Sequence, residues 1–448
     1  MAEGFGRPMN FPTLLGVYLA VNAVPDAHIL VDGPDCALYK AHFIHGRHDM
    51  NSTLLRISGR HRVAFSNVCS RGVVKEHDGI LRGHIETLDK LQESGLVLVT
   101  AMPMCSITGV DYGRVIRSMD GRLTKPVVDI PPDSLVGDWL DGYAQALLAM
   151  SRGLVPDRGP ARGGRASKPK KAAIVGYLMD RNEADHLGNL AELRRMLSAL
   201  SLETVCVWLG GEPAAALRRV AEADLVVSLP YGRAAARRLA RCVKARLVET
   251  ELPFGLPKAA RFMREVGRAA GRPEAAEAFI AAELSRVVPR LKWIIPQYFL
   301  GRRTAFMGDP YLLEGFLDIA QDLGLTVAAA ICRGRQAHHG AGARIPEGAA
   351  ATSIIYEPPS SSDAVQSLLR TPLDLLVSCF AKHDLARLEV PMVEFGFPSY
   401  HHHALFEQPF LGYNGFLAFV ERMADQLCAP QPGWRGGAGA PEGPPRTA

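Results

Sequence analysis

Eight cysteines are the residues of this chain best suited to chemistry, and three of them share one kind of position. Cys36 follows the apolar stretch HILV through DGPD, Cys69 follows RVAFSNV, and Cys105 follows LVLVTAMPM. Each therefore lies just beyond an apolar strand or short apolar stretch, or at a helix start, and loops at the carboxyl ends of strands meet at one edge of an open parallel sheet. Soft thiolates stabilise iron in both oxidation states, so three converging thiols would suit an iron–sulfur cluster. Three buried packing cysteines would have the same spacing.

The other five cysteines lie in segments that resemble ordinary core or surface structure. Cys206, Cys332 and Cys379 fall within or at the ends of apolar strands, whereas Cys242 and Cys428 fall in helical stretches. No CxxC pair occurs, and we expect a reducing compartment, so a disulfide framework is not predicted. We interpret these five residues as structural.

The elements that must position the cysteines follow from alternating apolar runs and helical segments. This alternation is typical of parallel sheets flanked by helices, and we predict an α/β fold of three Rossmann-like domains. The helices include 190–201 and 311–324, whose apolar residues recur at helical spacing. The expected strands are 27–33, 96–101, 172–178, 204–210, 224–230, 245–251, 303–309, 326–332 and 374–380.

Composition indicates where the domains end. The stretch from Ser151 to Lys171 is rich in Gly, Pro, Arg and Lys and reads as an exposed linker. A helical stretch from Pro273 to Leu291 is expected to lead into the last domain. We predict a cluster-binding domain over 1–160, a middle domain over 161–285, a C-terminal domain over 286–428 and a disordered tail over 429–448.

Several functional classes are disfavoured by composition and motifs. The net charge is only +5 and no basic stripe occurs, so nucleic acid is not an expected partner. The apolar run from Phe11 to Val24 is too short to span a membrane and ends at Pro25. Acidic Glu3 and the lack of a basic start argue against a signal peptide, so a cytoplasmic location is expected. No phosphate-binding loop is present, and ATP must therefore be hydrolysed elsewhere if it is used.

Four segments in order resemble the nitrogenase component 1 family. NFPTLLGVYLAVNAVPDAHILVDGPDCALYKAHF is similar to the opening of that family, with Cys36 at the position of a cluster cysteine, and LVTAMPMCSITGVDYGRVI matches a second one at Cys105. LGRRTAFMGDPYLLEGFLDIAQDLG resembles its G-D-P motif, and EVPMVEFGFPSYHHHALFEQPFLGYNGFLAFVERM resembles its G-F-P and G-Y-x-G ending. The likeness runs over residues 8 to 428 and is greatest to beta-type subunits.

The resemblance implies an oxidoreductase, as one subunit of an ATP-dependent two-component reductase. Electrons would come from an ATP-hydrolysing dimeric iron protein and would reduce a small molecule, with a tetrapyrrole as one candidate. Cys36, Cys69 and Cys105 would hold an iron–sulfur cluster of the [4Fe-4S] kind, shared with a paralogous alpha-type subunit or a second copy of this chain. A non-catalytic scaffold for metal-cofactor assembly and a paralogue without a cluster are the alternatives.

The sequence also departs from the family. Phe11 aligns with a further cluster cysteine of nitrogenase beta subunits, so a complete eight-iron cluster is not expected, and Asp35 or a partner residue would supply the fourth ligand. Pro230 and Leu411 align with the cofactor ligands of the alpha subunit and neither can bind a metal. We interpret the triple histidine 401–403 as exposed or partly packed loop residues, because neighbours on an extended segment point in alternate directions.

Overall fold

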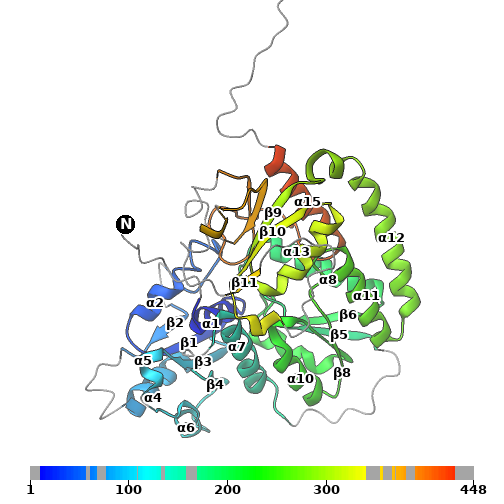
Figure 1. The fold of residues 1–448 in the computed structure, drawn as a ribbon. Helices are drawn as coiled ribbons and strands as arrows, with labels where there is room; N and C mark the ends of the chain where they lie inside the picture. Colours follow the sequence, from blue (N-terminus) through cyan, green and yellow to red (C-terminus); the bar gives the residue numbers. More distant parts are fainter. Residues whose placement is uncertain are drawn as a thin grey trace, which may run out of the picture.

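The chain folds around three separate parallel sheets, which confirms the predicted α/β class with three Rossmann-like units (Figure 1). The computed structural model describes residues 11–56, 61–67, 77–107, 109–132, 137–157, 169–339, 354–356, 366–368, 370–379 and 389–428. Among these residues, no helix is both long enough and apolar enough to cross a membrane.

The first sheet has the strand order β2-β1-β3-β4 and is covered on both faces. Leu30 of β1 packs with one set of helices, whereas Ile29 and Val31 pack with the other, as expected for a strand buried on both sides. Its strands are β1 (Ala27–Asp32), β2 (Val63–Phe65), β3 (Leu96–Ala101) and β4 (Val127–Asp129). Its helices are α1 (Thr13–Asn22), α2 (Cys36–Ala41), α4 (His77–Asp89), α5 (Pro103–Ser106), α6 (Tyr112–Arg117) and α7 (Trp139–Leu154).

The middle sheet has the order β6-β5-β7-β8. Its strands are β5 (Lys171–Val175), β6 (Glu203–Val207), β7 (Leu225–Ser228) and β8 (Arg246–Glu249). The helical elements around it are α8 (Ala184–Ala199), α9 (Ala214–Leu217), η1 (Arg218–Glu222), η2 (Pro230–Gly232), α10 (Arg233–Cys242) and α11 (Leu256–Ala270). The long helix α12 (Pro273–Leu291) follows, with the bounds expected from the sequence.

The third sheet has the order β11-β10-β9-β12-β13. Its strands are β9 (Arg303–Gly308), β10 (Thr326–Cys332), β11 (Ile354–Tyr356), β12 (Leu375–Ser378) and β13 (Met392–Glu394). The helical elements are η3 (Ile295–Phe299), α13 (Pro310–Asp322), η4 (Gln336–His339) and α15 (Gly412–Cys428). Helix α15 packs on α8 and α11 as well as on the third sheet, so it joins two parts of the molecule.

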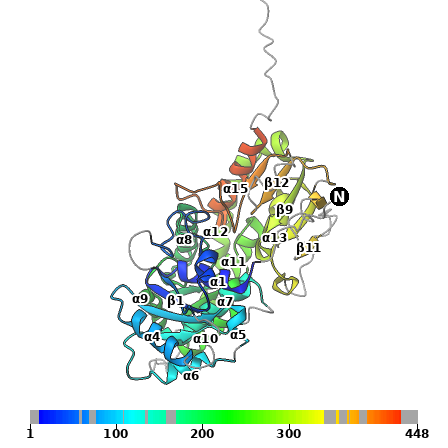
Figure 2. The ribbon, with the colours of Figure 1, turned by 90° about the vertical axis from the view of Figure 1, so that its left-hand side faces the viewer.

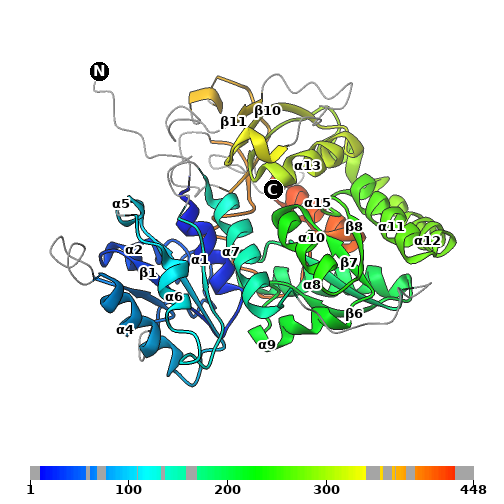
Figure 3. The same ribbon diagram turned by 90° about the horizontal axis from the view of Figure 1, so that it is seen from below.

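Helices α1 and α7 lie side by side between the first sheet and the middle part of the chain (Figure 3). A Cβ on Gly16 would lie 1.6 Å from the Trp139 carbonyl oxygen, and one on Gly142 would lie 1.9 Å from the Thr13 carbonyl oxygen. Only glycine allows two helix backbones to approach this closely. All ten residues of α1 are buried, so the early apolar run is a core helix.

The third sheet lies at the opposite end of the molecule from helices α4 and α6 of the first unit (Figure 2).

The predicted linker was wrong at its start: residues 151–154 form the last turn of α7, because Ser151 and Leu154 are buried there. The predicted disordered tail over 429–448 lies outside the described residues. The domain boundaries at 160 and 285 stay predictions.

Candidate metal centre

Cys36 lies at the surface, immediately beyond the carboxyl end of β1. The loop Gly33–Asp35 separates it from the strand, and Cys36 is the first residue of α2. Both Asp35 and Cys36 are exposed, and the Asp35 side chain makes no capping hydrogen bond to the helix. The thiol and the carboxylate are thus both open to a metal or to a partner chain.

Cys105 occupies the equivalent place beyond β3 but is buried. It lies in the short helix α5 and has 3% of its surface exposed. Burial, with a contribution from the nearby Asp32 carboxylate, raises the pKa of the Cys105 thiol to about 11. The thiol is therefore protonated at neutral pH, and iron binding at Cys105 would require loss of that proton.

The two cysteine loops are neighbours because β1 and β3 pair in parallel. Asp32 lies opposite Ala101 in the register, so Gly33 and Met102 leave the sheet next to each other. The Met102 sulfur lies 3.6 Å from the Cys36 sulfur. Gly33 permits this contact, because it has a φ of +152° and a Cβ there would lie 2.8 Å from Met102 Cγ. The structure thus brings the Cys36 sulfur against the segment that leads to Cys105.

The third predicted ligand, Cys69, lies outside the described residues. Its loop follows β2, which pairs with β1 on the side away from β3, with Phe65 opposite Val31. The three predicted ligands therefore follow three neighbouring parallel strands. Cys36 and Cys105 offer two soft thiol donors, which is the chemistry that iron–sulfur clusters require. The donors in the described residues fit such a group in kind, although they do not complete it.

Asp32 lies directly beneath these loops and was not singled out by the sequence. It is fully buried at the last position of β1. Ser66 Oγ donates to Asp32 Oδ1 at 2.6 Å, Tyr112 OH donates to Oδ2 at 2.7 Å, and His77 Nε2 lies 2.8 Å from Oδ2. In the sequence, the only sign of this buried position was an acidic residue at the end of an apolar strand.

Phe11, which the sequence resemblance aligns with a further cysteine of nitrogenase beta subunits, packs against the third sheet's unit. The Arg333 guanidinium carbon lies 4.1 Å from the centre of the Phe11 ring, and the ring of Phe397 lies 5.4 Å away. A cation over an aromatic face is attractive, by about 1 kcal/mol. This position therefore contributes to packing between the units.

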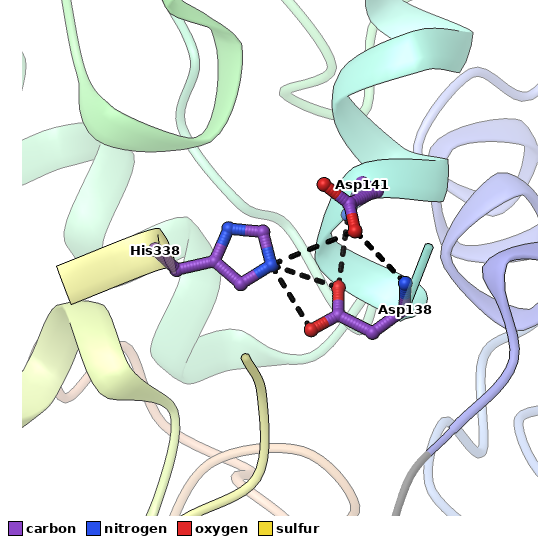
Figure 4. A group of neighbouring side chains, drawn as sticks. All are labelled: Asp138, Asp141 and His338. Carbon is purple, nitrogen blue, oxygen red and sulfur yellow. Dashed lines mark hydrogen bonds and ion pairs between the residues drawn. The ribbon is translucent and has the colours of Figure 1, made fainter. Parts of the chain in front are cut away.

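Three side chains, Asp138, Asp141 and His338, meet at distances compatible with a metal site (Figure 4). Asp138 and Asp141 form the capping box of α7, and His338 Nε2 lies 2.9 Å from Asp138 Oδ1. Arg335 donates its backbone N–H to Asp138 and its guanidinium to Asp141. Because these donors already use the carboxylate oxygens, the group is a helix cap and an ion-pair cluster between α7 and η4. Nothing in the sequence indicated it beyond the spacing of the two aspartates.

The pKa of His338 reflects this cluster. Burial by itself lowers that pKa, but the hydrogen bond to Asp138 and the charges of Asp138 and Asp141 outweigh burial and raise it. Asp138 responds in the opposite sense, because the bonds to His338 lower its pKa against the effect of burial. The protonated imidazole is therefore favoured at the contact between α7 and η4.

The three histidines 401–403 are exposed or partly packed, as the sequence predicted. His403 Nδ1 lies 2.7 Å from Glu183 Oε1, and the backbone carbonyl of His402 accepts a hydrogen bond from Arg181. Burial, with nearby Arg422 and Arg181, lowers the pKa of His402 to about 4. The segment is thus held against the residues that precede α8.

A small cavity lies between the middle and third units. Its lining includes Tyr177, Asp180, Tyr231 and Leu411, the last being one of the positions aligned with a cofactor ligand of the alpha subunit. The cavity volume is about 30 Å³, enough for about two water molecules. A large metal cofactor has no room there in this conformation.

The remaining cysteines agree with their structural interpretation. Cys206, Cys332 and Cys379 are buried, Cys242 is half-buried and Cys428 is exposed. Burial raises the pKa of Cys206 to about 12. These cysteines belong to elements of the middle and third units or, for Cys379, follow strand β12.

The three-sheet fold and the loops of Cys36 and Cys105 at the carboxyl edge of the first sheet agree with one known protein family. Residues 12–428 match the family model "Nitrogenase component 1 type Oxidoreductase". The chain belongs to this family of oxidoreductases, whose members act as subunits of complexes. The resemblance inferred from the sequence is confirmed.

The relatives have low sequence identity to this chain but match it over much of its length. The nitrogenase molybdenum-iron protein beta chain of Frankia alni is 24% identical over 377 residues, covering 77% of this chain and 69% of that protein. The beta chain of Methanococcus maripaludis is 22% identical, covering 67% of each. A solved structure, "Nitrogenase Cp1 at pH 6.5", superposes with a TM-score of 0.78 at 17% identity and covers 95% of this chain and 94% of its own. At this identity the superposition establishes the fold.

Proposed function

We propose that this chain is the iron–sulfur-cluster subunit of a nitrogenase-like, ATP-dependent two-component reductase, with Cys36, Cys69 and Cys105 as cluster ligands. The observation that supports this proposal best is the pairing of β1 with β3, which makes the loops of Cys36 and Cys105 neighbours. The contact between the Cys36 and Met102 sulfurs adds a soft-donor environment. A bound cluster would supply one-electron transfer.

The exposure of Cys36 and Asp35 bears on how the cluster would be completed. The thiols of Cys36, Cys69 and Cys105 would bind three of the irons of a [4Fe-4S] cluster. The fourth iron would need a different ligand. Asp35 stands beside Cys36 and could provide an oxygen, or a partner subunit could approach the exposed edge and provide the fourth ligand. We therefore propose a [4Fe-4S] cluster shared with a paralogous alpha-type subunit or with a second copy of this chain.

Electrons would reach this edge from an ATP-hydrolysing dimeric iron protein, because this chain carries no phosphate-binding loop of its own. The substrate would be a small molecule that is difficult to reduce, and a tetrapyrrole is one candidate. The cavity of about 30 Å³ between the middle and third units is far too small for a tetrapyrrole. We propose that a substrate of that size binds outside this cavity, in the partner or between the two subunits.

One experiment tests the ligand role. The complex is purified without oxygen together with its partner, and iron, acid-labile sulfide and the electron paramagnetic resonance signal of the reduced protein are measured. Cys36→Ser and Cys105→Ser should each lower the iron content and remove or alter the signal. Cys428→Ser is the control for exposed Cys36, and Cys206→Ser is the control for buried Cys105. Iron-free wild-type complex after anaerobic reconstitution would refute the proposal.

A scaffold for metal-cofactor assembly is the second candidate. Phe11, packed under Arg333 where beta subunits have a cysteine, favours a cluster simpler than that of nitrogenase and is compatible with this role. Substrate reduction that depends on ATP and on the iron protein would support the reductase. Transfer of a metal cluster to a second protein, without substrate reduction, would support the scaffold.

A further inference from the structure

Asp32 and the residues that hydrogen-bond to its carboxylate each lie close in sequence to one of the three cysteines. Asp32 itself stands four residues before Cys36, at the end of β1. Ser66 stands three residues before Cys69, and His77 stands eight residues after it. The Asp32 carboxylate therefore binds the chain on both sides of the segment that holds Cys69.

The Cys105 segment is bound to the same carboxylate. Tyr112 stands seven residues after Cys105, at the start of α6, and its hydroxyl donates to Asp32 Oδ2 at 2.7 Å. Tyr112 is 6% exposed and packs in the same core cluster as Cys105. One carboxylate thus accepts from residues beyond β2 and beyond β3, the two strands that flank β1 in the sheet.

The Cys36 loop is tied in through Ser66. The backbone N–H of Gly33 donates to Ser66 Oγ at 2.9 Å, while the same hydroxyl donates to Asp32. The backbone N–H of Asn67 donates to the carbonyl of Gly33 at 3.0 Å. The turn between β1 and Cys36 is therefore held against the chain that leads to Cys69.

A fully buried carboxylate requires a reason, because its desolvation is costly unless hydrogen bonds compensate. Asp32 is 0% exposed, and no arginine or lysine pairs with it among the described ion pairs. Its partners come from three separate elements, and none of them is within the strand that carries it. Such a group contributes more to the relative placement of those elements than an apolar side chain would, since each hydrogen bond fixes a direction.

We propose that Asp32 is a positioning residue that holds the Cys36 segment, the Cys105 segment and the residues on either side of the Cys69 segment together beneath the metal centre, so that the Cys36 and Cys105 thiols are arranged before iron binds. This inference depends on the proposed function in one respect, that the cysteines are cluster ligands. The positioning of the segments by Asp32 does not require bound metal, and it can be measured on the metal-free chain.

The first measurement is hydrogen–deuterium exchange of the full chain without metal. Asp32→Asn keeps the shape of the side chain but cannot accept from all three donors, because its amide nitrogen is a donor. Losing a hydrogen bond to a charged group corresponds to roughly tenfold to hundredfold faster exchange. We expect that increase in peptides covering 61–67, 77–89 and 103–117.

Two milder variants separate the arms and protect the test against misfolding. Tyr112→Phe removes one hydroxyl and should loosen only 103–117, whereas Ser66→Ala should loosen 61–67 and the turn at Gly33. Asp89→Asn is the matched control, since Asp89 is buried in the same unit and accepts from the backbone N–H of Lys125 at 2.9 Å, at the opposite edge of the sheet. It should leave exchange of 61–67 and 103–117 unchanged, and 77–89 is left out of this comparison because it contains Asp89.

The second measurement concerns the metal-loaded complex. Tyr112→Phe should change the shape of the electron paramagnetic resonance signal per bound iron while its melting temperature stays close to wild type. A role in overall stability alone would lower the melting temperature and leave the signal of the remaining cluster unaltered. Asp32→Asn should lower the iron content several-fold relative to Asp89→Asn.

The outcomes distinguish this inference from the proposed function. Unchanged exchange in Asp32→Asn and Tyr112→Phe, or an unaltered signal at full iron content, overturns the positioning role. If the wild-type complex takes up no iron while Asp32→Asn still loosens the three segments, the proposed cluster role fails and the arrangement of the segments by Asp32 stands.

Discussion

Arg62 should be among the most sensitive positions of the first unit. It precedes β2, is fully buried, and its Nη1 donates to the carbonyls of Val21, Val24 and Ala27 at 2.8, 2.9 and 2.8 Å. These carbonyls lie at the end of α1 and the start of β1. One guanidinium therefore joins the helix and the two strands that lead to the Cys36 and Cys69 segments.

The expected effect of Arg62→Met follows from these contacts. Each of the three hydrogen bonds from the charged guanidinium is worth about 1.5–3 kcal/mol, although the carbonyls of Val21 and Val24 keep backbone N–H donors from Val24 and Ala27. Removing the buried charge gives some of this back: burial lowers the pKa of Arg62 from 12.5 to about 10, which corresponds to about 3 kcal/mol. Three such bonds, less about 3 kcal/mol for the buried charge, leave a net loss centred on about 3–4 kcal/mol, and Arg62→Lys, which keeps the charge, should lose less.

The assay is native-state hydrogen exchange of a peptide that covers β1, because a chain with three sheets need not unfold in one step. A loss of about 3–4 kcal/mol corresponds to roughly several-hundred-fold faster exchange of that peptide. Arg152→Met, at an exposed position in the last turn of α7, is the control. Exchange of β1 that remains at the wild-type rate in Arg62→Met would refute the assigned role.

Two further predictions concern the cysteine edge and the contact between α7 and η4. Gly33→Ala should lower the melting temperature more than Gly46→Ala, because both positions have positive φ but only Gly33 would bring a Cβ to 2.8 Å from Met102 Cγ; equal losses would argue against the Met102 contact. His338→Gln should destabilise the chain most at low pH. The folded-state pKa of His338 lies above the ordinary 6.5. The contribution of protonated His338 to the free energy of unfolding is therefore complete below about pH 6.5 and is lost as the pH rises through the folded-state pKa. Melting temperatures from pH 5.5 to 8.5 should therefore converge with wild type on the alkaline side, and a constant difference would contradict the linkage.

Much of the fold was predictable because long apolar runs leave little choice. The strands expected at 27–33, 96–101 and 326–332 appear with nearly the same bounds, as Ala27–Asp32, Leu96–Ala101 and Thr326–Cys332. Short strands were missed. β4 and β13 have three residues each; β4 is partly exposed and β13 ends in the charged residue Glu394, so neither produces a sustained apolar run.

The candidate site was predictable in part, because the positions of Cys36 and Cys105 after strands follow from the strands themselves. Their different exposure did not follow from the sequence: α2 begins at the surface, whereas α5 packs in the core with Tyr112. Asp32 was missed because a carboxylate at the end of a strand is usually solvated. Its burial depends on three donors that arrive from other elements.

The sequence by itself determined the family, the α/β class and the strands that the cysteines follow, because these depend on local apolar pattern and on motifs that are contiguous in the chain. The tertiary structure decided which loops become neighbours, which thiol is buried, and that Asp32, Arg62 and the Asp138–His338 contact join distant segments. The physical reason is that pairing of parallel strands and burial of polar groups depend on partners far apart in the sequence, and no local pattern specifies those partners.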